Sequence, residues 1–217
     1  MTKYVYMFGG ARADGDGQMK ELLGGKGAGL AEMTNVGLPV PPGFTIATSA
    51  CRHFFSAAST VNPELEQQTR AALERLEQMT GQRFGDPQRP LLVSVRSGAK
   101  FSMPGMMDTI LNLGLNDTTV TTLARQTANP RFAWDCYRRF IQMFGNVVLG
   151  IGKEKFDAIF EAAKQQRGTR LDIDLDAGAL AQVVKRYKKL VVKETGKPLP
   201  EDPREQLRMA RDAVFNS

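Results

Sequence analysis

The stretch Val93-Ser94-Val95-Arg96-Ser97-Gly98-Ala99 decides how the middle of this chain folds. It ends an apolar run that begins at Leu91, and the polar, Met-rich segment 101–109 follows it. A second strand candidate covers residues 108–113. Two strand candidates on either side of a segment with Gly and Pro predict two strands joined by a loop.

The end of the first strand carries a candidate ligand-binding arginine. Arg96 comes directly after the apolar run, and ligands often bind where strands of α/β folds end. Its planar guanidinium suits phosphate oxygens, although by local pattern alone a surface salt bridge is slightly favoured. The Met residues of 101–109 suggest a loop that closes over a nucleotide; packing in the core is the alternative.

Closer to the N-terminus, Leu23-Gly24-Gly25-Lys26-Gly27-Ala28-Gly29-Leu30 is a second candidate site. Glycines let backbone amides approach a phosphate, and the positive end of a helix favours an anion. Lys26 in a first helical turn opposes the helix dipole unless an anion binds there. A Walker loop would need Gly at Lys20 and Ser or Thr at Gly27, so an ordinary Gly-rich turn stays an equal alternative.

The remaining pattern predicts an α+β chain in three parts. Residues 1–115 combine strands at 4–8 and 44–47 with helices at 26–36 and from 63. Residues 116–200 show helical periodicity only and predict an all-helical subdomain. Residues 201–217 begin a new helix after a cap at Asp202. This helix has no glycine or proline stop signal, so we expect a truncated chain.

Composition restricts the classes of function. Hydrophobic residues make up 42% of the chain and charged residues 24%, close to the averages of globular proteins. No apolar run approaches the ~20 residues of a membrane span, and the N-terminus lacks the layout of a secretory signal. We therefore expect a cytoplasmic protein. The net charge of +6 keeps nucleic-acid binding open, although the basic run 185–189 has the spacing of a solvated helix face. His53 is the single histidine, and Cys51 and Cys136 lie far apart; neither type predicts a metal site.

Several stretches together resemble the pyruvate phosphate dikinase family. The most specific is the block from Arg96 to Gly114, and the others are 24–28, 37–44, 140–145 and 202–207. The resemblance covers essentially the whole chain. Pyruvate, water dikinases are similar in the Pro-Pro-Gly-Phe and Arg-Ser segments but differ across 102–109, so they are the second choice.

The resemblance implies an ATP-grasp nucleotide domain with a helical insertion. In this family ATP donates a pyrophosphoryl group to a histidine on a separate swivelling domain and AMP is released. Inorganic phosphate is consumed to form pyrophosphate, and the remaining phosphoryl group converts pyruvate to phosphoenolpyruvate. Lys26 and Arg96 would hold the ATP phosphates, and Arg139 matches a family arginine near them. The residues implied to cover the phosphates are Gly105, Met106, Met107, Asp108 and Thr109.

Some family features have no counterpart in this sequence. The carrier histidine of the family lies in a Gly-Gly-Met-Thr-Ser-His-Ala segment, which is absent, and His53 does not match it. We expect the Mg²⁺ ligands and the adenine contacts after residue 217, so the chain alone should be inactive. The implied partners are ATP and the other domains of a homodimeric dikinase, with no nucleic acid and no membrane. The competing hypothesis is a basic binding module that uses 185–189, with salt-sensitive affinity.

Overall fold

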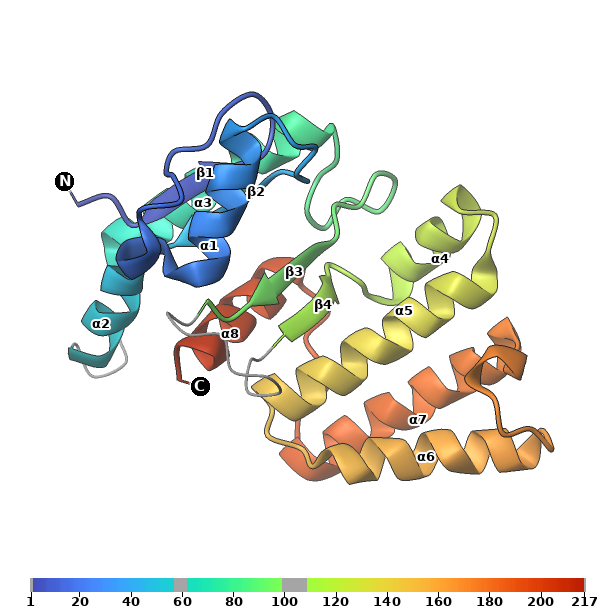
Figure 1. Cartoon of the computed structure of the whole chain (residues 1–217). Coiled ribbons are helices and arrows are strands. Elements are labelled where there is room, and N and C mark those ends of the chain that lie inside the picture. Colours follow the sequence, from blue (N-terminus) through green and yellow to red (C-terminus); the bar gives the residue numbers. More distant parts are fainter. Residues whose placement is uncertain (1, 57–61, 99–108, 217) are drawn as a thin grey trace. The chain divides into compact units, whose positions relative to one another are not determined.

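The computed structural model describes residues 2–56, 62–98 and 109–216 of the chain. They divide into two compact units, which we describe separately. Unit 1 comprises Met1–Gln82 and Ser97–Met107, and unit 2 comprises Arg83–Arg96 and Asp108–Ser217. Figure 1 shows the elements of both along the chain.

The elements of unit 1 are β1 (Val5–Phe8), α1 (Lys20–Asn35), β2 (Gly43–Ile46), α2 (Thr48–Ser56) and α3 (Pro63–Thr80). Unit 2 contains β3 (Val93–Arg96), β4 (Thr109–Leu113), α4 (Asp117–Gln126), α5 (Pro130–Met143), a π-helical turn (Phe144–Val148), α6 (Lys153–Gln166), a 3-10 turn (Asp172–Asp174), α7 (Ala177–Thr195) and α8 (Pro203–Phe215).

Unit 1 is built on a two-stranded antiparallel sheet. β1 pairs with β2 so that Val5 lies opposite Ile46 and Phe8 opposite Gly43. Both α1 and α3 pack against β1. Ala13 and Ala28 belong to the buried cluster beneath α1. Small residues on the buried face of α1 let this helix lie close to the sheet. This close packing fixes the position of the N-terminal half of α1.

The helix ends of unit 1 follow local sequence signals. The side chain of Asn62 accepts a hydrogen bond from the Glu64 amide, and Pro63 begins α3, as expected. Gly37, just after α1, has a φ of 82°, and the Leu38 amide donates to the Met33 carbonyl in the pattern of a Schellman cap. These termini therefore form from short-range chemistry.

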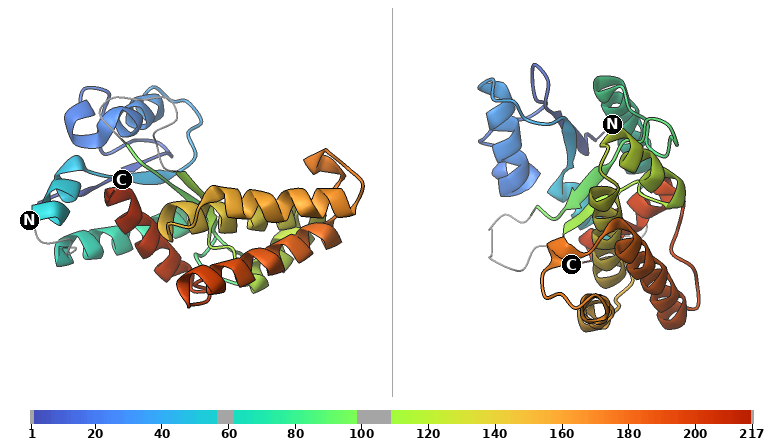
Figure 2. Two further views of the ribbon diagram at one scale, coloured as in Figure 1. Left: turned by 90° about the horizontal axis from the view of Figure 1, so that it is seen from below. Right: turned by 90° about the vertical axis from the view of Figure 1, so that its right-hand side faces the viewer.

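Unit 2 combines a second antiparallel pair, β3 and β4, with a set of long helices. Val93 lies opposite Leu113 and Arg96 opposite Thr109. α5 and α7 pack together along their lengths, and α6 packs against α7 (Figures 1 and 2). The interface between α6 and α7 is aromatic. The rings of Phe156 and Tyr187 meet edge to face, and their centres are 4.9 Å apart.

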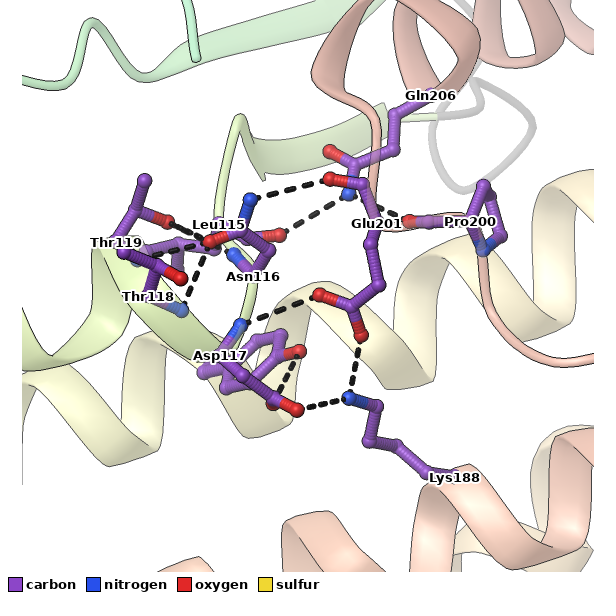
Figure 3. Close-up of polar contacts among 10 residues, drawn as sticks. Leu115, Asn116, Asp117, Thr118, Thr119, Lys188, Pro200, Glu201 and Gln206 are labelled. Atoms are coloured by element: carbon purple, nitrogen blue, oxygen red, sulfur yellow. Dashed lines mark hydrogen bonds and ion pairs between the residues drawn. The ribbon is translucent and has the colours of Figure 1, made fainter. Parts of the chain in front are cut away.

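The start of α8 is fixed to the β4–α4 connection by buried polar contacts (Figure 3). Gln206 is fully buried; its amide group donates to the carbonyls of Leu115 and Pro200 and accepts from the Gly114 amide. Around it, Lys188 bridges Asp117 and Glu201. Figure 3 also shows the side chain of Asn116, which accepts from the amides of Thr118 and Thr119. The hydroxyl of Tyr137 donates to Asp117 at 3.1 Å.

The predicted strands at 4–8, 44–47, 91–95 and 108–113 are each confirmed to within two residues. The helix predicted from Lys26 was wrong at its start, because α1 begins at Lys20 and the backbone breaks at Gly24 instead. Met79, in the last turn of α3, is 40% exposed.

Mixed helix and sheet agree with the predicted α+β class. The predicted ranges 1–115, 116–200 and 201–217 concern the domains of a larger protein and stay a prediction. Across the described residues, every helix is too short or too polar to cross a membrane.

Candidate functional site

The main feature of unit 1 is a break inside α1 at Gly24. Its φ of 69° and ψ of 167° lie in a region that is essentially restricted to glycine. The hydroxyl of Thr48 donates to the Glu21 carbonyl at 2.7 Å, one turn before the break. The first turn of α2 therefore supports the backbone where the regular helix is interrupted.

A second glycine segment lies directly against this break. A Cβ atom on Gly24 would be 2.2 Å from the carbonyl oxygen of Gly98, so the two backbones approach too closely for any side chain. The ammonium group of Lys26 donates to the Ser97 carbonyl at 3.2 Å. The two segments are separate motifs in the sequence, and the structure brings them together within unit 1.

The neighbouring glycines serve different purposes. A Cβ on Gly27 would be 2.7 Å from Cγ2 of Thr45 in β2, so this glycine allows α1 to approach the sheet closely. A Cβ on Gly29 would meet nothing within 4 Å. Gly24 and Gly27 are therefore required by space, whereas Gly29 is not.

This arrangement has the chemistry of an anion site. The helix resumes immediately after Gly24, so its positive end lies at the break, and Lys26 is exposed there. Across the described ranges, no carboxylate pairs with Lys26, and the partner found for its ammonium is a carbonyl. The positive charge of Lys26 therefore remains available to a negatively charged ligand.

Unit 2 holds the other predicted site residues that the structure describes. Arg96 is the exposed last residue of β3, and its Cα partner is Thr109 at the start of β4. Arg139 lies on α5. Within the described part of unit 2, no hydrogen bond or ion pair joins Arg139 to Arg96 or Thr109. The predicted residues 105–108 lie outside the described residues.

Arg139 takes part in a charge cluster that the sequence prediction missed. Its Nε donates to Oδ2 of Asp135 at 2.8 Å, and its side chain is 55% exposed. The buried Arg138 binds the other oxygen of the same carboxylate. The signal was present in the spacing, because residues three and four positions apart lie on one helix face.

Burial alone would raise the pKa of the Asp135 carboxyl. The charge and hydrogen bonds of Arg138, followed by those of Arg139, outweigh it and lower the pKa below its ordinary value. Asp135 is therefore ionised at neutral pH. Its charge is shared between two arginines.

Residues that bind metals do not cluster in the described ranges. No three or more His, Cys, Asp or Glu side chains in residues 2–56, 62–98 and 109–216 are grouped so that they could hold a metal ion. The described donors do not fit a Mg²⁺ site of their own.

Comparison with known proteins identifies relatives of the whole chain. The sequence model described as "Pyruvate phosphate dikinase, AMP/ATP-binding domain" matches residues 20–80. The chain is 50% identical over 217 residues to a pyruvate, phosphate dikinase of Rhizobium meliloti and 48% identical over 219 residues to that of Clostridium symbiosum. It is also 50% identical over 215 residues to the chloroplastic pyruvate, phosphate dikinase 1 of Oryza sativa.

These matches cover 99–100% of this chain but only 23–24% of those proteins. The chain thus spans about a quarter of the length of the curated relatives it matches. The matched AMP/ATP-binding region begins at the first residue of α1 and includes both Gly24 and Lys26. Over its whole length the chain is therefore similar to part of these pyruvate, phosphate dikinases, and its residues 20–80 match the model of their AMP/ATP-binding domain.

Proposed function

We propose that this chain binds ATP as the nucleotide-binding part of a pyruvate phosphate dikinase, and that the phosphates bind where α1 resumes after Gly24. The observation that carries the proposal is the exposed, carboxylate-free Lys26 beside a glycine-only backbone break. A phosphate oxygen would replace the Ser97 carbonyl as the acceptor of the Lys26 ammonium. The contact with a carbonyl is weak enough to exchange, since it holds no opposite charge.

Two arginines have proposed roles in the same reaction. Arg96 directly precedes Ser97 in the chain, and its guanidinium would bind phosphate oxygens in a bidentate manner. Arg139 would supply a further positive charge. Gly105 to Thr109 would cover the phosphates. Positioning and neutralisation of charge dominate phosphoryl transfer, and cationic side chains contribute to both.

The wider proposal concerns the complete enzyme. There the chain would form part of an ATP-grasp domain with an inserted helical subdomain, in a cytoplasmic homodimer. ATP would pass a pyrophosphoryl group to a histidine of another domain, and pyruvate and phosphate would yield phosphoenolpyruvate and pyrophosphate, with AMP released. Mg²⁺, which neutralises phosphate charge when bound, would take its protein ligands from the rest of the enzyme.

Calorimetric titration of the full chain with Mg-ATP tests the proposal. We expect saturable binding by the wild type and a dissociation constant raised at least about tenfold by Lys26→Glu, because a hydrogen bond to a charged group contributes about 1.5–3 kcal/mol. Absence of binding by the wild type, or equal affinity of the variant, would contradict the proposal.

The matched control is Lys189→Glu, which makes the same charge change at an exposed position of α7 in unit 2. Its affinity for ATP should equal that of the wild type. If Lys189→Glu weakens binding as much as Lys26→Glu, the effect comes from net charge and the basic-module hypothesis gains instead.

A further inference from the structure

The two halves of α1 on either side of the break at Gly24 are held by one short segment, residues 45–48. Before the break, the hydroxyl of Thr48 donates to the Glu21 carbonyl at 2.7 Å. After the break, Gly27 lies directly against Thr45, since a Cβ atom on this glycine would be only 2.7 Å from Cγ2 of the threonine. The segment 45–48 therefore fixes how the second half of α1 continues from the first.

The segment 45–48 is itself anchored in the sheet of unit 1. Its first residues end β2, which pairs with β1. The Ala47 amide donates to the Tyr4 carbonyl at 2.8 Å, and Ala47 is 1% exposed. Thr48 follows directly and begins α2. The hydroxyl of Thr48 is therefore a donor whose place is set by the sheet, and the Glu21 carbonyl is held by that donor.

The carbonyl that Thr48 binds is one whose helical partner is affected by the break. In a continuous α-helix each carbonyl accepts from the amide four residues later, so Glu21 would accept from Gly25. That bond requires helical dihedral angles at Gly24, whose φ of 69° and ψ of 167° are not helical. The Thr48 hydroxyl thus donates to the Glu21 carbonyl in place of the Gly25 amide.

This exchange of donors concerns the first amides of the resumed helix. The first amides of any helix lack an acceptor within it and point toward its N-terminal end, where anions bind. After Gly24 these are the amides of Gly25, Lys26 and Gly27. If the Glu21 carbonyl recaptured the Gly25 amide, α1 would be continuous at this point, and the group of donors would be lost to a ligand.

We propose that Thr48 is a positioning residue of the phosphate site: by donating to the Glu21 carbonyl, it keeps the Gly25 amide free to bind a phosphate oxygen of ATP. This role rests on the proposed function, which takes the phosphates of ATP as the ligand at the break. Thr48 acts through the backbone of α1 and not by contact with the nucleotide. It decides the competition between a continuous α1, in which Glu21 accepts from Gly25, and the broken α1 that presents its amides.

Amide hydrogen exchange, measured by NMR on the full chain without ATP, tests this role directly. We expect the Gly25 amide to exchange rapidly in the wild type and several-fold more slowly in Thr48→Val, because the Glu21 carbonyl released by Thr48 then accepts from Gly25. Thr48→Ser keeps the hydroxyl and should keep the rapid exchange. A merely structural role of Thr48 would instead make exchange faster along the whole of α1 in Thr48→Val.

Two outcomes of the exchange measurement would overturn the proposal. One is slow exchange of the Gly25 amide in the wild type, which needs no variant and so decides the question even if Thr48→Val does not fold. The other is exchange at Gly25 that is unchanged or faster in a folded Thr48→Val.

Calorimetric titration of the full chain with Mg-ATP measures the consequence for binding. Thr48→Val should raise the dissociation constant about 2- to 10-fold, the range for one hydrogen bond between uncharged groups, whereas Thr48→Ser should bind like the wild type. Thr80→Val is the matched control, because the Thr80 hydroxyl also donates to a backbone carbonyl, that of Leu76 in α3. It should leave the affinity unchanged. Equal loss in Thr48→Val and Thr80→Val, or in Thr48→Val and Thr48→Ser, would overturn the proposal.

These results separate the two proposals. If Lys26→Glu abolishes binding while Thr48→Val binds ATP like the wild type, only the role of Thr48 falls. If the wild type does not bind ATP, the proposed function itself falls, and exchange at Gly25 then reports only on the fold of α1.

Discussion

At the scale of single residues, Gly24 links the fold to the proposed function. Its backbone conformation and its contact with the Gly98 carbonyl each exclude a side chain. The sequence pointed to a glycine-rich site around Lys26 but placed no break at Gly24. It could not have done so, because the break depends on a backbone contact with a segment far along the chain.

We predict that Gly24→Ala lowers the free energy of unfolding by about 1–3 kcal/mol or more, because alanine is strained at this φ and its Cβ overlaps the Gly98 carbonyl. Urea denaturation checks this. Gly29→Ala is the control: its Cβ meets nothing within 4 Å, so it should stabilise the helix by up to about 1 kcal/mol. Equal effects of the two substitutions would contradict the assignment.

At the scale of elements, the sequence was most informative where the determinants are local. The caps at Asn62, Asp176 and Asp202 each accept a backbone amide, as their types and spacing predict. The charge cluster of α5 was missed. Its helix spacing is visible in the sequence, but the burial of Arg138 against Phe160 depends on how α5 and α6 pack.

Gln206 shows how one buried amide joins elements. We predict that Gln206→Leu lowers the free energy of unfolding by roughly 2–5 kcal/mol, because the Gly114 amide and two carbonyls lose their partner inside the protein. Arg204→Ala, exposed on the same helix, should change it by less than about 0.5 kcal/mol. Similar urea midpoints for both variants would show that Gln206 is not needed to fix α8.

Because of Lys188, the stability of unit 2 should fall as the pH rises in the alkaline range. Burial alone would lower the pKa of its ammonium group, but hydrogen bonds to Asp117 and Glu201 raise it above the ordinary value. Its contribution is therefore complete below the unfolded-state pKa of about 10.4 and is lost as pH rises through the higher folded-state pKa.

We therefore expect the free energy of unfolding to fall more steeply above about pH 10 in the wild type than in Lys188→Met. Urea denaturation at pH 8 and above pH 10 measures the difference. Lys189→Met, an exposed neighbour on α7, should keep the wild-type slope. Identical slopes in all three proteins would exclude Lys188 as the cause.

At the scale of the whole molecule, the sequence predicted the α+β class and the similarity to pyruvate, phosphate dikinases, for which the block from Arg96 to Gly114 was the most specific stretch. It could not predict the two compact units, since the chain passes between them at several points. Unit 1 gathers Lys26 with Ser97 and Gly98, whereas Arg96 belongs to unit 2.

Ligand binding to the folded chain should raise its stability as a whole. At an ATP concentration of 100 times the dissociation constant, we expect the free energy of unfolding to increase by about 2.7 kcal/mol. Adenosine should have a much smaller effect, because the proposed contacts are to phosphates. A thermal shift that is the same with adenosine, or the same in Lys26→Glu, would show that stabilisation does not come from the phosphate site.

The central claim is that the break at Gly24 forms a phosphate site. An NMR titration of the isotopically labelled full chain with Mg-ATP tests it most directly. We expect saturable shifts of the amides of residues 25–27 and of Ser97 and Gly98, and loss of these shifts in Lys26→Glu. Shifts confined to other parts of the chain, or no shifts at saturating ATP, would contradict it.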